Sequence, residues 1–255
     1  MKNLVSQDFV SYEETVAQIL DEAGAGPYLA EQPRILLKPN LTTDIPFPVT
    51  TPPALCEAVI HYIRSHNPDA EVVIAEGCGQ VEKETEDMFQ ALGYVEMAER
   101  LGVELVDLNY LPLRTVEHPS LEVYSCLYLP EIAFTYAVVS LPVLKAHTLV
   151  PMTGTIKNMM GFLPPKHYTG VYGVWKKAVF HGQLHESLRD LSLCLRPQLT
   201  LLDASVGLAG HHLGGVPCSP PVGKLLAGTD PFAVDREGAR LLGIDWREVE
   251  YLREV

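Results

Sequence analysis

The stretch Tyr136-Ala-Val-Val-Ser-Leu-Pro-Val-Leu-Lys-Ala-His147 decides the fold. Its first half, 136–141, is almost continuously apolar, which is typical of a strand buried on both faces of a sheet. Lys145 and His147 follow two positions apart, so an extended backbone points both side chains the same way. Ligands bind just beyond the carboxyl ends of parallel strands, so the stretch predicts a central strand with a site at its end.

Short strand-like runs alternate with helical stretches along the rest of the chain. Three runs resemble the first and end at charged residues: 34–38, 71–76 and 199–203. This alternation predicts an α/β fold with a mostly parallel central sheet, helices on both faces and some antiparallel strands, one of them over 121–129. We expect residues 1–255 to form a single α/β domain, with a long Gly- and Pro-rich loop at about 207–221.

Composition and charge exclude several classes of protein. The 255 residues are 47% hydrophobic and 20% charged, which is ordinary for a globular protein and not for a disordered or fibrous one. A net charge of −13 disfavours nucleic acids and anionic membranes as partners. The first residues lack an apolar leader, and the longest apolar stretch, 132–144, is too short to span a bilayer, so we expect a cytoplasmic protein.

Cysteine and histidine spacing disfavours a resident metal. The five cysteines are scattered without a CxxC pair, so we expect reduced thiols and no iron–sulfur cluster or structural zinc in this chain. His181 and His185 have the i, i+4 spacing of metal ligands on one helix face. No third ligand is evident, so these two are only the first candidates if a metal does bind.

A window without acids stands out in this acidic chain. Between Lys145 and His185 there is no Asp, Glu or Arg, whereas there are five lysines and four histidines. Two readings are open: a solvated basic face that pairs with acids elsewhere, or a pocket for a small anion such as a phosphate or carboxylate. We favour the pocket, because Lys145 and His147 already lie at a predicted strand end.

Helix signals strengthen the anion interpretation. Thr153 is a candidate N-cap of a helix predicted over 153–163, and free N–H groups at such a terminus attract anions. Lys157 lies one turn further on, beside Asn158. The neighbouring pair Lys176 and Lys177 is expected to be exposed, as are His211 and His212 in the long loop.

Carboxylates at strand ends complete the candidate set. Glu76 and Asp203 each terminate a buried run, and each is a candidate general base or counter-ion for the lysines. Asp230 either joins the site or caps a helix opened by Pro231. The candidate catalytic residues are Lys145, His147, Lys157, Glu76 and Asp203. The candidate substrate-binding residues are Lys38, Asn40, Thr153, Asn158, Lys166, His167 and Asp230.

Several blocks of this sequence resemble the family called domain of unknown function 362. The resemblance runs from about Arg34 to the C-terminus. Its blocks are Lys38-Pro-Asn40, Thr50-Thr-Pro52, Leu141-Pro-Val-Leu-Lys-Ala-His147, Thr155-Ile-Lys-Asn-Met-Met-Gly161, Lys166-His167, Asp203 and Leu225-Leu-Ala-Gly-Thr-Asp-Pro-Phe-Ala-Val-Asp235.

The resemblance implies a link to redox chemistry, because many members carry ferredoxin-type domains that bind two [4Fe–4S] clusters. This chain has no such cysteine run and looks like the core module alone. It also departs from the family at Ala209, in the turn Gly207-Leu-Ala-Gly-His-His212, where an acid is usual. That departure argues against shared acid chemistry at this turn.

Two functions follow from these observations. The first is an enzyme core that binds a small anionic substrate or cofactor in a crevice rich in Lys and His, with the redox association that the resemblance implies. The second is a non-catalytic ligand- or metal-binding module that serves an iron–sulfur or other redox partner. Neither a nucleophile–base triad nor a Gly-rich nucleotide loop is present, so the sequence specifies no reaction and no cofactor.

Overall fold

A central mixed sheet organises the chain in this computed structural model, which describes residues 1–169 and 176–253. Seven strands follow one another in the order β1-β11-β10-β7-β2-β3-β4, and β8 and β9 extend the sheet from β10. Their bounds are β1 (Val5–Asp8), β2 (Arg34–Pro39), β3 (Glu71–Glu76), β4 (Glu104–Asp107), β7 (Ala137–Leu141), β8 (Val143–Ala146), β9 (Met152–Thr153), β10 (Leu199–Leu208) and β11 (Lys224–Gly228).

The sheet is parallel at its centre and antiparallel at one side. Strands β10, β7, β2, β3 and β4 pair in parallel, and β8 also runs parallel to β10. The pairs β1–β11, β10–β11 and β8–β9 are antiparallel. The predicted α/β class with a mostly parallel sheet is therefore confirmed.

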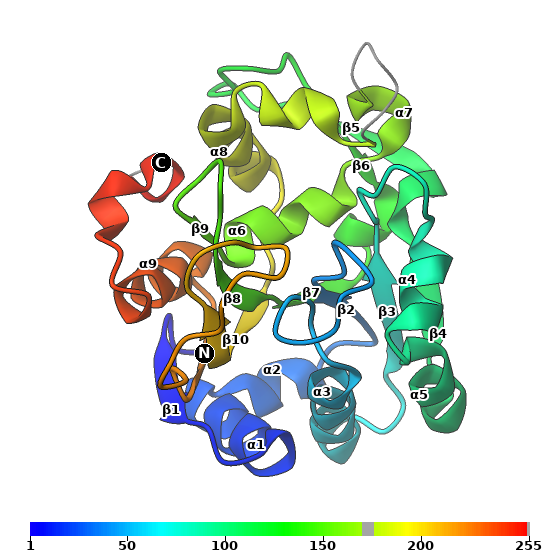
Figure 1. Ribbon diagram of the computed structural model, residues 1–255. Coiled ribbons are helices and arrows are strands. Elements are labelled where there is room, and N and C mark those ends of the chain that lie inside the picture. The colour runs from blue at the N-terminus through cyan, green and yellow to red at the C-terminus, as the bar shows by residue number, and fades with distance from the viewer. Residues whose placement is uncertain (170–175, 254–255) are drawn as a thin grey trace.

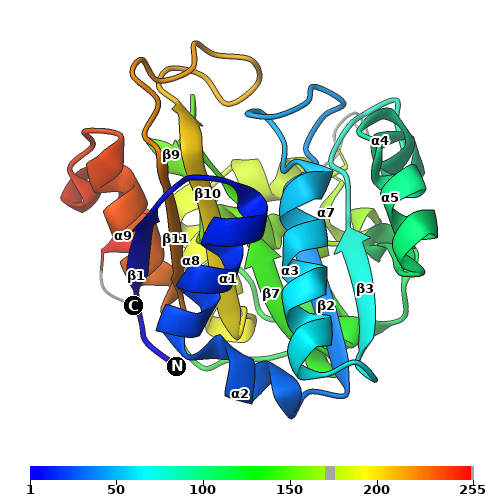
Figure 2. The ribbon, with the colours of Figure 1, turned by 90° about the horizontal axis from the view of Figure 1, so that it is seen from below.

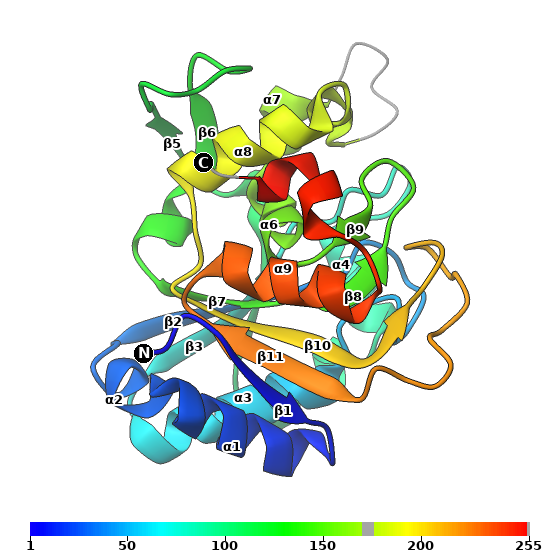
Figure 3. The same cartoon turned by 90° about the vertical axis from the view of Figure 1, so that its left-hand side faces the viewer.

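Helices cover both faces of this sheet (Figures 1 and 3). One face packs against α1 (Tyr12–Ala23), α3 (Pro53–His66) and α5 (Tyr94–Leu101), and the other against α6 (Thr155–Asn158), α8 (Leu184–Cys194) and α9 (Pro231–Leu241). Successive side chains of β2 point to opposite faces of the sheet, so this strand contributes to the hydrophobic core on each side. Ile35 and Leu37 pack on the α1–α3 side, and Leu36 packs on the α6–α9 side. Because helices cover both faces of the sheet, the central strands have apolar residues at nearly every position.

The remaining helices and strands lie at the margins. They are α2 (Ala25–Ala30), α4 (Thr85–Ala91), α7 (Pro165–Tyr168), β5 (Leu113–Val116) and β6 (Leu127–Pro130). The antiparallel strand predicted over 121–129 is realised only as β6, which pairs with β5 in a separate small sheet.

In the described ranges, 1–169 and 176–253, no helix has the length and apolar character needed to cross a membrane.

Two loops rise from the same end of the sheet, where the parallel strands finish (Figure 2). One connects β2 to α3, and the other connects β10 to β11 and contains the predicted Gly- and Pro-rich segment. The carboxyl ends of β2, β3 and β8 open toward this end. The fold therefore brings polar residues from distant segments together, as expected of parallel sheets.

Candidate functional site

A cavity of about 290 Å³ lies beyond the carboxyl ends of β2, β3 and β8. Its wall contains one carboxylate, Glu76, together with two lysines and three histidines. The polar and charged lining residues are Asn40, Thr42, Glu76, Gln80, His147, Thr153, Lys157, Asn158, Lys177, His181 and His212.

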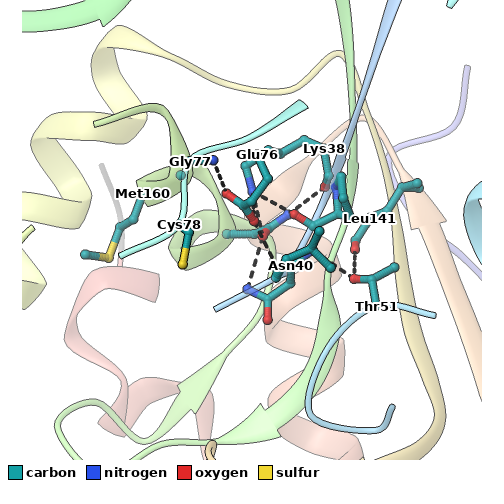
Figure 4. Close-up of polar contacts among 12 residues, drawn as sticks. Lys38, Asn40, Thr51, Glu76, Gly77, Cys78, Leu141 and Met160 are labelled. Carbon is teal, nitrogen blue, oxygen red and sulfur yellow. Dashed lines mark hydrogen bonds and ion pairs between the residues drawn. The ribbon is translucent and has the colours of Figure 1, made fainter. Parts of the chain in front are cut away.

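A buried ion pair forms the floor of this region (Figure 4). Lys38, at the end of β2, is fully buried and its Nζ donates to Glu76 Oε2 at 2.7 Å. Glu76, at the end of β3, also accepts from the backbone N–H of Leu41 at 3.0 Å and of Gly77 at 2.7 Å. Burial lowers the pKa of Lys38, and the Glu76 charge opposes that shift. Both partners are thus held by hydrogen bonds as well as by charge.

Asparagines connect this pair to a second buried lysine. Asn158, on α6, donates to the carbonyl of Lys38 and accepts from the side chain of Asn40 at 3.2 Å. Asn40 in turn accepts from Lys145 Nζ at 2.7 Å, and Lys145 also donates to the carbonyl of Val49. We call Lys38, Asn40, Glu76, Lys145 and Asn158 the polar layer. Every member has its hydrogen-bond partners within the protein.

Lys177 is a site residue that the sequence analysis missed. It was predicted to be exposed with Lys176, but it is 5% exposed and its Nζ donates to the carbonyls of Gly77, Met160 and Gly161. A side chain on Gly161 would collide with Glu76 and Lys38, so only glycine lets this backbone approach the polar layer. Lys177 therefore ties two backbone segments together at the cavity wall.

Part of the cavity wall has polar atoms without partners. Lys157 is partly buried and lines the cavity, and its Nζ makes no hydrogen bond or ion pair within residues 1–169 and 176–253. The hydroxyls of Thr42 and Thr153 and Nδ1 of His212 are buried yet unpartnered within the same ranges. Burial without a partner is costly, so this wall suits a ligand that supplies hydrogen-bond acceptors and donors.

Two imidazoles stack against each other beside Lys157. The rings of His147 and His212 lie 3.7 Å apart between centroids, although His212 comes from the long loop. His147 Nδ1 accepts from the backbone N–H of Leu149 at 3.0 Å, which fixes the ring. Burial, followed by the charge of Lys157, lowers the pKa of His147 far below its usual range and that of His212 to about 3. Both rings are therefore neutral at pH 7 in the empty site.

Burial also shifts the lysines toward neutrality. It lowers the pKa of Lys157 to about 8, and those of Lys145 and Lys177 to about 7. The charge of Lys157 adds to the shift of Lys145. A bound anion would favour the charged form of a nearby amine and would offset part of these shifts.

Several sequence-predicted residues lie away from the cavity. Asp203 is buried on the other face of the sheet, where Tyr12 donates to its carboxylate at 2.6 Å. Its position on β10 has the parity of Leu201, which faces α1 and α3, so the expectation that Asp203 shares the crevice with Lys38 and Glu76 was wrong. Lys166 and His167 are exposed on α7, and the His167 ring stacks on Tyr128.

Helix capping explains two further differences. Asp230 accepts from the N–H groups of Phe232 and Ala233 and caps α9, so the capping alternative holds. Thr153 belongs to β9 and caps nothing, although it lines the cavity. The N-terminus of the short helix α6 is occupied by Asp235, whose carboxylate accepts from Thr155 and Ile156 N–H. The predicted anion site at that terminus is thus filled by the protein itself.

The two candidate metal ligands do not share a helix face. A 3₁₀ turn ends at His181, and α8 begins only at Leu184. His181 is exposed at the mouth of the cavity, whereas the His185 ring lies 5.8 Å from that of Tyr251. Among the described residues, no group of three or more His, Cys, Asp or Glu side chains is arranged to hold a metal ion.

Comparisons with known proteins agree with the fold. The sequence profile described as "Domain of unknown function (DUF362)" matches residues 35–240. The "Thylakoid-associated protein sll1697" of Synechocystis is 26% identical over 234 residues, which cover 87% of this chain and 67% of that protein. The lactate racemase apoprotein of Thermoanaerobacterium thermosaccharolyticum superposes with a TM-score of 0.60 at 14% identity over 92% of this chain. That match spans only 56% of the racemase chain.

Proposed function

We propose that this chain, which belongs to the DUF362 family, is an enzyme core that binds a small anionic substrate in the cavity and moves protons on it. The observation that carries the proposal is the wall formed by Lys157, Thr42, Thr153 and His212, whose polar atoms lack partners in the described ranges. The one carboxylate in the lining, Glu76, is already neutralised by Lys38. The cavity wall thus offers donors and positive charge without an unpaired anion of its own.

A small carboxylate is the substrate class that fits best. A volume of about 290 Å³ is at the lower end for ligand cavities and admits a small organic acid. Thr42 and Thr153 can donate hydrogen bonds to carboxylate oxygens, while Lys157 supplies charge. The structural neighbour is a lactate racemase, and lactate belongs to this class of compound.

The imidazoles supply the proposed proton transfer. His147 and His212 are both neutral at pH 7. His147 Nδ1 already accepts from the N–H of Leu149, so its Nε2 carries the proton and can donate it, while His212, whose Nδ1 has no partner in the described ranges, can accept one. Binding of an anion beside them raises the imidazole pKa toward the range useful for acid–base catalysis. The alternative is a non-catalytic module that holds an anion for an iron–sulfur or other redox partner, which needs no proton transfer at these rings.

Binding is tested by thermal unfolding with formate, acetate, lactate, oxalate and phosphate at constant ionic strength. An anion at 100 times its dissociation constant should stabilise the protein by about 2.7 kcal/mol, or roughly 5–10 °C. Lys157→Ala should abolish the shift without destabilising the empty protein, and the exposed-site variant Lys166→Ala should keep it. Equal shifts in the parent and Lys157→Ala, or none with any anion, would refute the site.

Catalysis is tested by incubating acetate and lactate, the two anions of this set with a C–H bond beside the carboxylate, with the protein in heavy water. Proton NMR should show exchange of the C–H hydrogen beside the carboxylate, and His147→Gln should abolish exchange while keeping the thermal shift. A thermal shift without exchange for any of these acids would instead favour the binding module.

A further inference from the structure

The lysines around the cavity differ in what their amines touch. Lys38, Lys145 and Lys177 each donate to carboxylate, amide or carbonyl oxygens of the protein. Lys157 lines the cavity and makes no such bond within the described ranges, so its nitrogen is available to a ligand. We propose that the Lys157 amine forms an imine with a small anionic aldehyde or ketone bound in this cavity.

The surroundings of Lys157 favour this reaction. An amine attacks a carbonyl only in its neutral form, and burial holds the pKa of Lys157 at about 8. Neutral imidazoles lie beside it, because burial, followed by the charge of Lys157, lowers the pKa of both His147 and His212. The amine thus has proton donors and acceptors at hand, and Glu76, the one carboxylate of the cavity lining, is already paired with Lys38.

The proposed step balances without a further reagent. The nitrogen lone pair of Lys157 attacks the carbonyl carbon, a C–N bond forms, and a proton passes from nitrogen to the former carbonyl oxygen through an imidazole. The remaining N–H proton then passes through the imidazole to the hydroxyl, the C–O bond breaks, water leaves, and the C=N bond forms. The inference deepens the proposed function and rests on it, because the carboxylate of the ligand is held by the same cavity.

Glyoxylate, a small anionic aldehyde, is a suitable probe together with sodium cyanoborohydride. The reductant gives a hydride to the imine carbon, water gives a proton to nitrogen, and Lys157 retains a stable carboxymethyl group. Peptide mass spectrometry over a time course at about pH 7.5 should show Lys157 modified at least about tenfold faster than Lys166, because exposed lysines hold little neutral amine at that pH. In urea, this difference should vanish.

Competition separates this inference from the proposed function. Glycolate, which has no carbonyl carbon to attack, should stabilise the protein thermally and slow the modification of Lys157. Lys157→Arg should keep the glycolate shift, since charge is retained, and lose the modification at position 157. If Lys157 of the parent protein is modified no faster than Lys166, the proposed imine is refuted, whatever the result with Lys157→Arg. If glycolate still stabilises the protein in that case, the proposed function is retained. If glycolate does not stabilise it, both the imine and the proposed function are refuted.

Discussion

The polar layer and the cavity wall above it are made of similar residues in opposite states. In the polar layer, Lys38 pairs with Glu76 at 2.7 Å and Lys145 donates to Asn40 at 2.7 Å. In the wall, Lys157 and Thr153 have no partner within the part of the chain that the structure describes. A satisfied buried network rigidifies a fold, whereas an unsatisfied one favours a ligand. The difference separates the lysines that hold the fold around the site from the one whose amine can contact a ligand.

The largest expected effect comes from breaking the polar layer. Glu76→Gln leaves the Lys38 amine without its counter-charge in a fully buried position, and should lower the free energy of unfolding by about 3–5 kcal/mol. Urea denaturation measures the change. Glu57→Gln is the control, because Glu57 pairs with Arg100 at the surface and should cost under about 1 kcal/mol. Equal losses in the two variants would show that the buried pair contributes nothing special.

The pH dependence of stability should sharpen the comparison. The pKa values of Lys145, Lys157 and Lys177 are lowered to between about 7 and 8, so the folded protein releases protons that the unfolded chain keeps up to about pH 10. Unfolding then takes up protons, and the free energy of unfolding of the ligand-free protein rises with pH across this window.

Lys177→Met tests that pH dependence directly. Unfolding of the variant should take up one proton fewer than unfolding of the parent protein. Between about pH 8 and pH 10 its free energy of unfolding should therefore rise by about 3 kcal/mol less, as measured by urea denaturation at each pH. Lys166→Met, at an exposed position, should keep the slope of the parent protein. An unchanged slope in Lys177→Met would show that this buried amine stays charged.

The smallest effect is expected from a matched pair of threonines. Thr51 donates to the carbonyl of Leu141 and accepts from Asn40 N–H, so Thr51→Val leaves two buried groups without a partner. The free energy of unfolding should fall by about 1–3 kcal/mol. Thr153→Val removes an unpartnered hydroxyl and should leave the empty protein unchanged or slightly stabilised. Thermal unfolding of both variants checks the contrast. A larger loss for Thr153→Val would show that its hydroxyl already has a partner.

Strand ends carried most of what the sequence predicted correctly. Continuous apolar runs located β2, β3 and β7, and the charged residues at the ends of the first two located Lys38 and Glu76 beside one another. The same rule misplaced Asp203, because a strand end does not specify which face a side chain takes. The hydrogen bond that Tyr12, at the start of α1, donates to Asp203 shows which face this side chain takes, and only the packed structure reveals that contact.

The missed residues come from segments without a periodic signal. Lys177 stands beside Lys176 in sequence, and only the packed chain shows that one amine reaches the backbone of Gly77 while the other pairs with Glu84. His212 belongs to a Gly- and Pro-rich loop, where no pattern fixes a side chain's direction. The length of that loop was the available hint, since long unstructured loops in compact domains are usually functional.

The stacking of His212 on His147 has a consequence for how this site can diversify. His147 directly follows β8 and its ring is held by the N–H of Leu149, whereas His212 lies on the loop between β10 and β11. Insertions and substitutions in such loops are tolerated far better than changes in a buried strand. Changes in this loop can therefore alter which ligand the cavity accepts, while the buried amines beneath it stay in place.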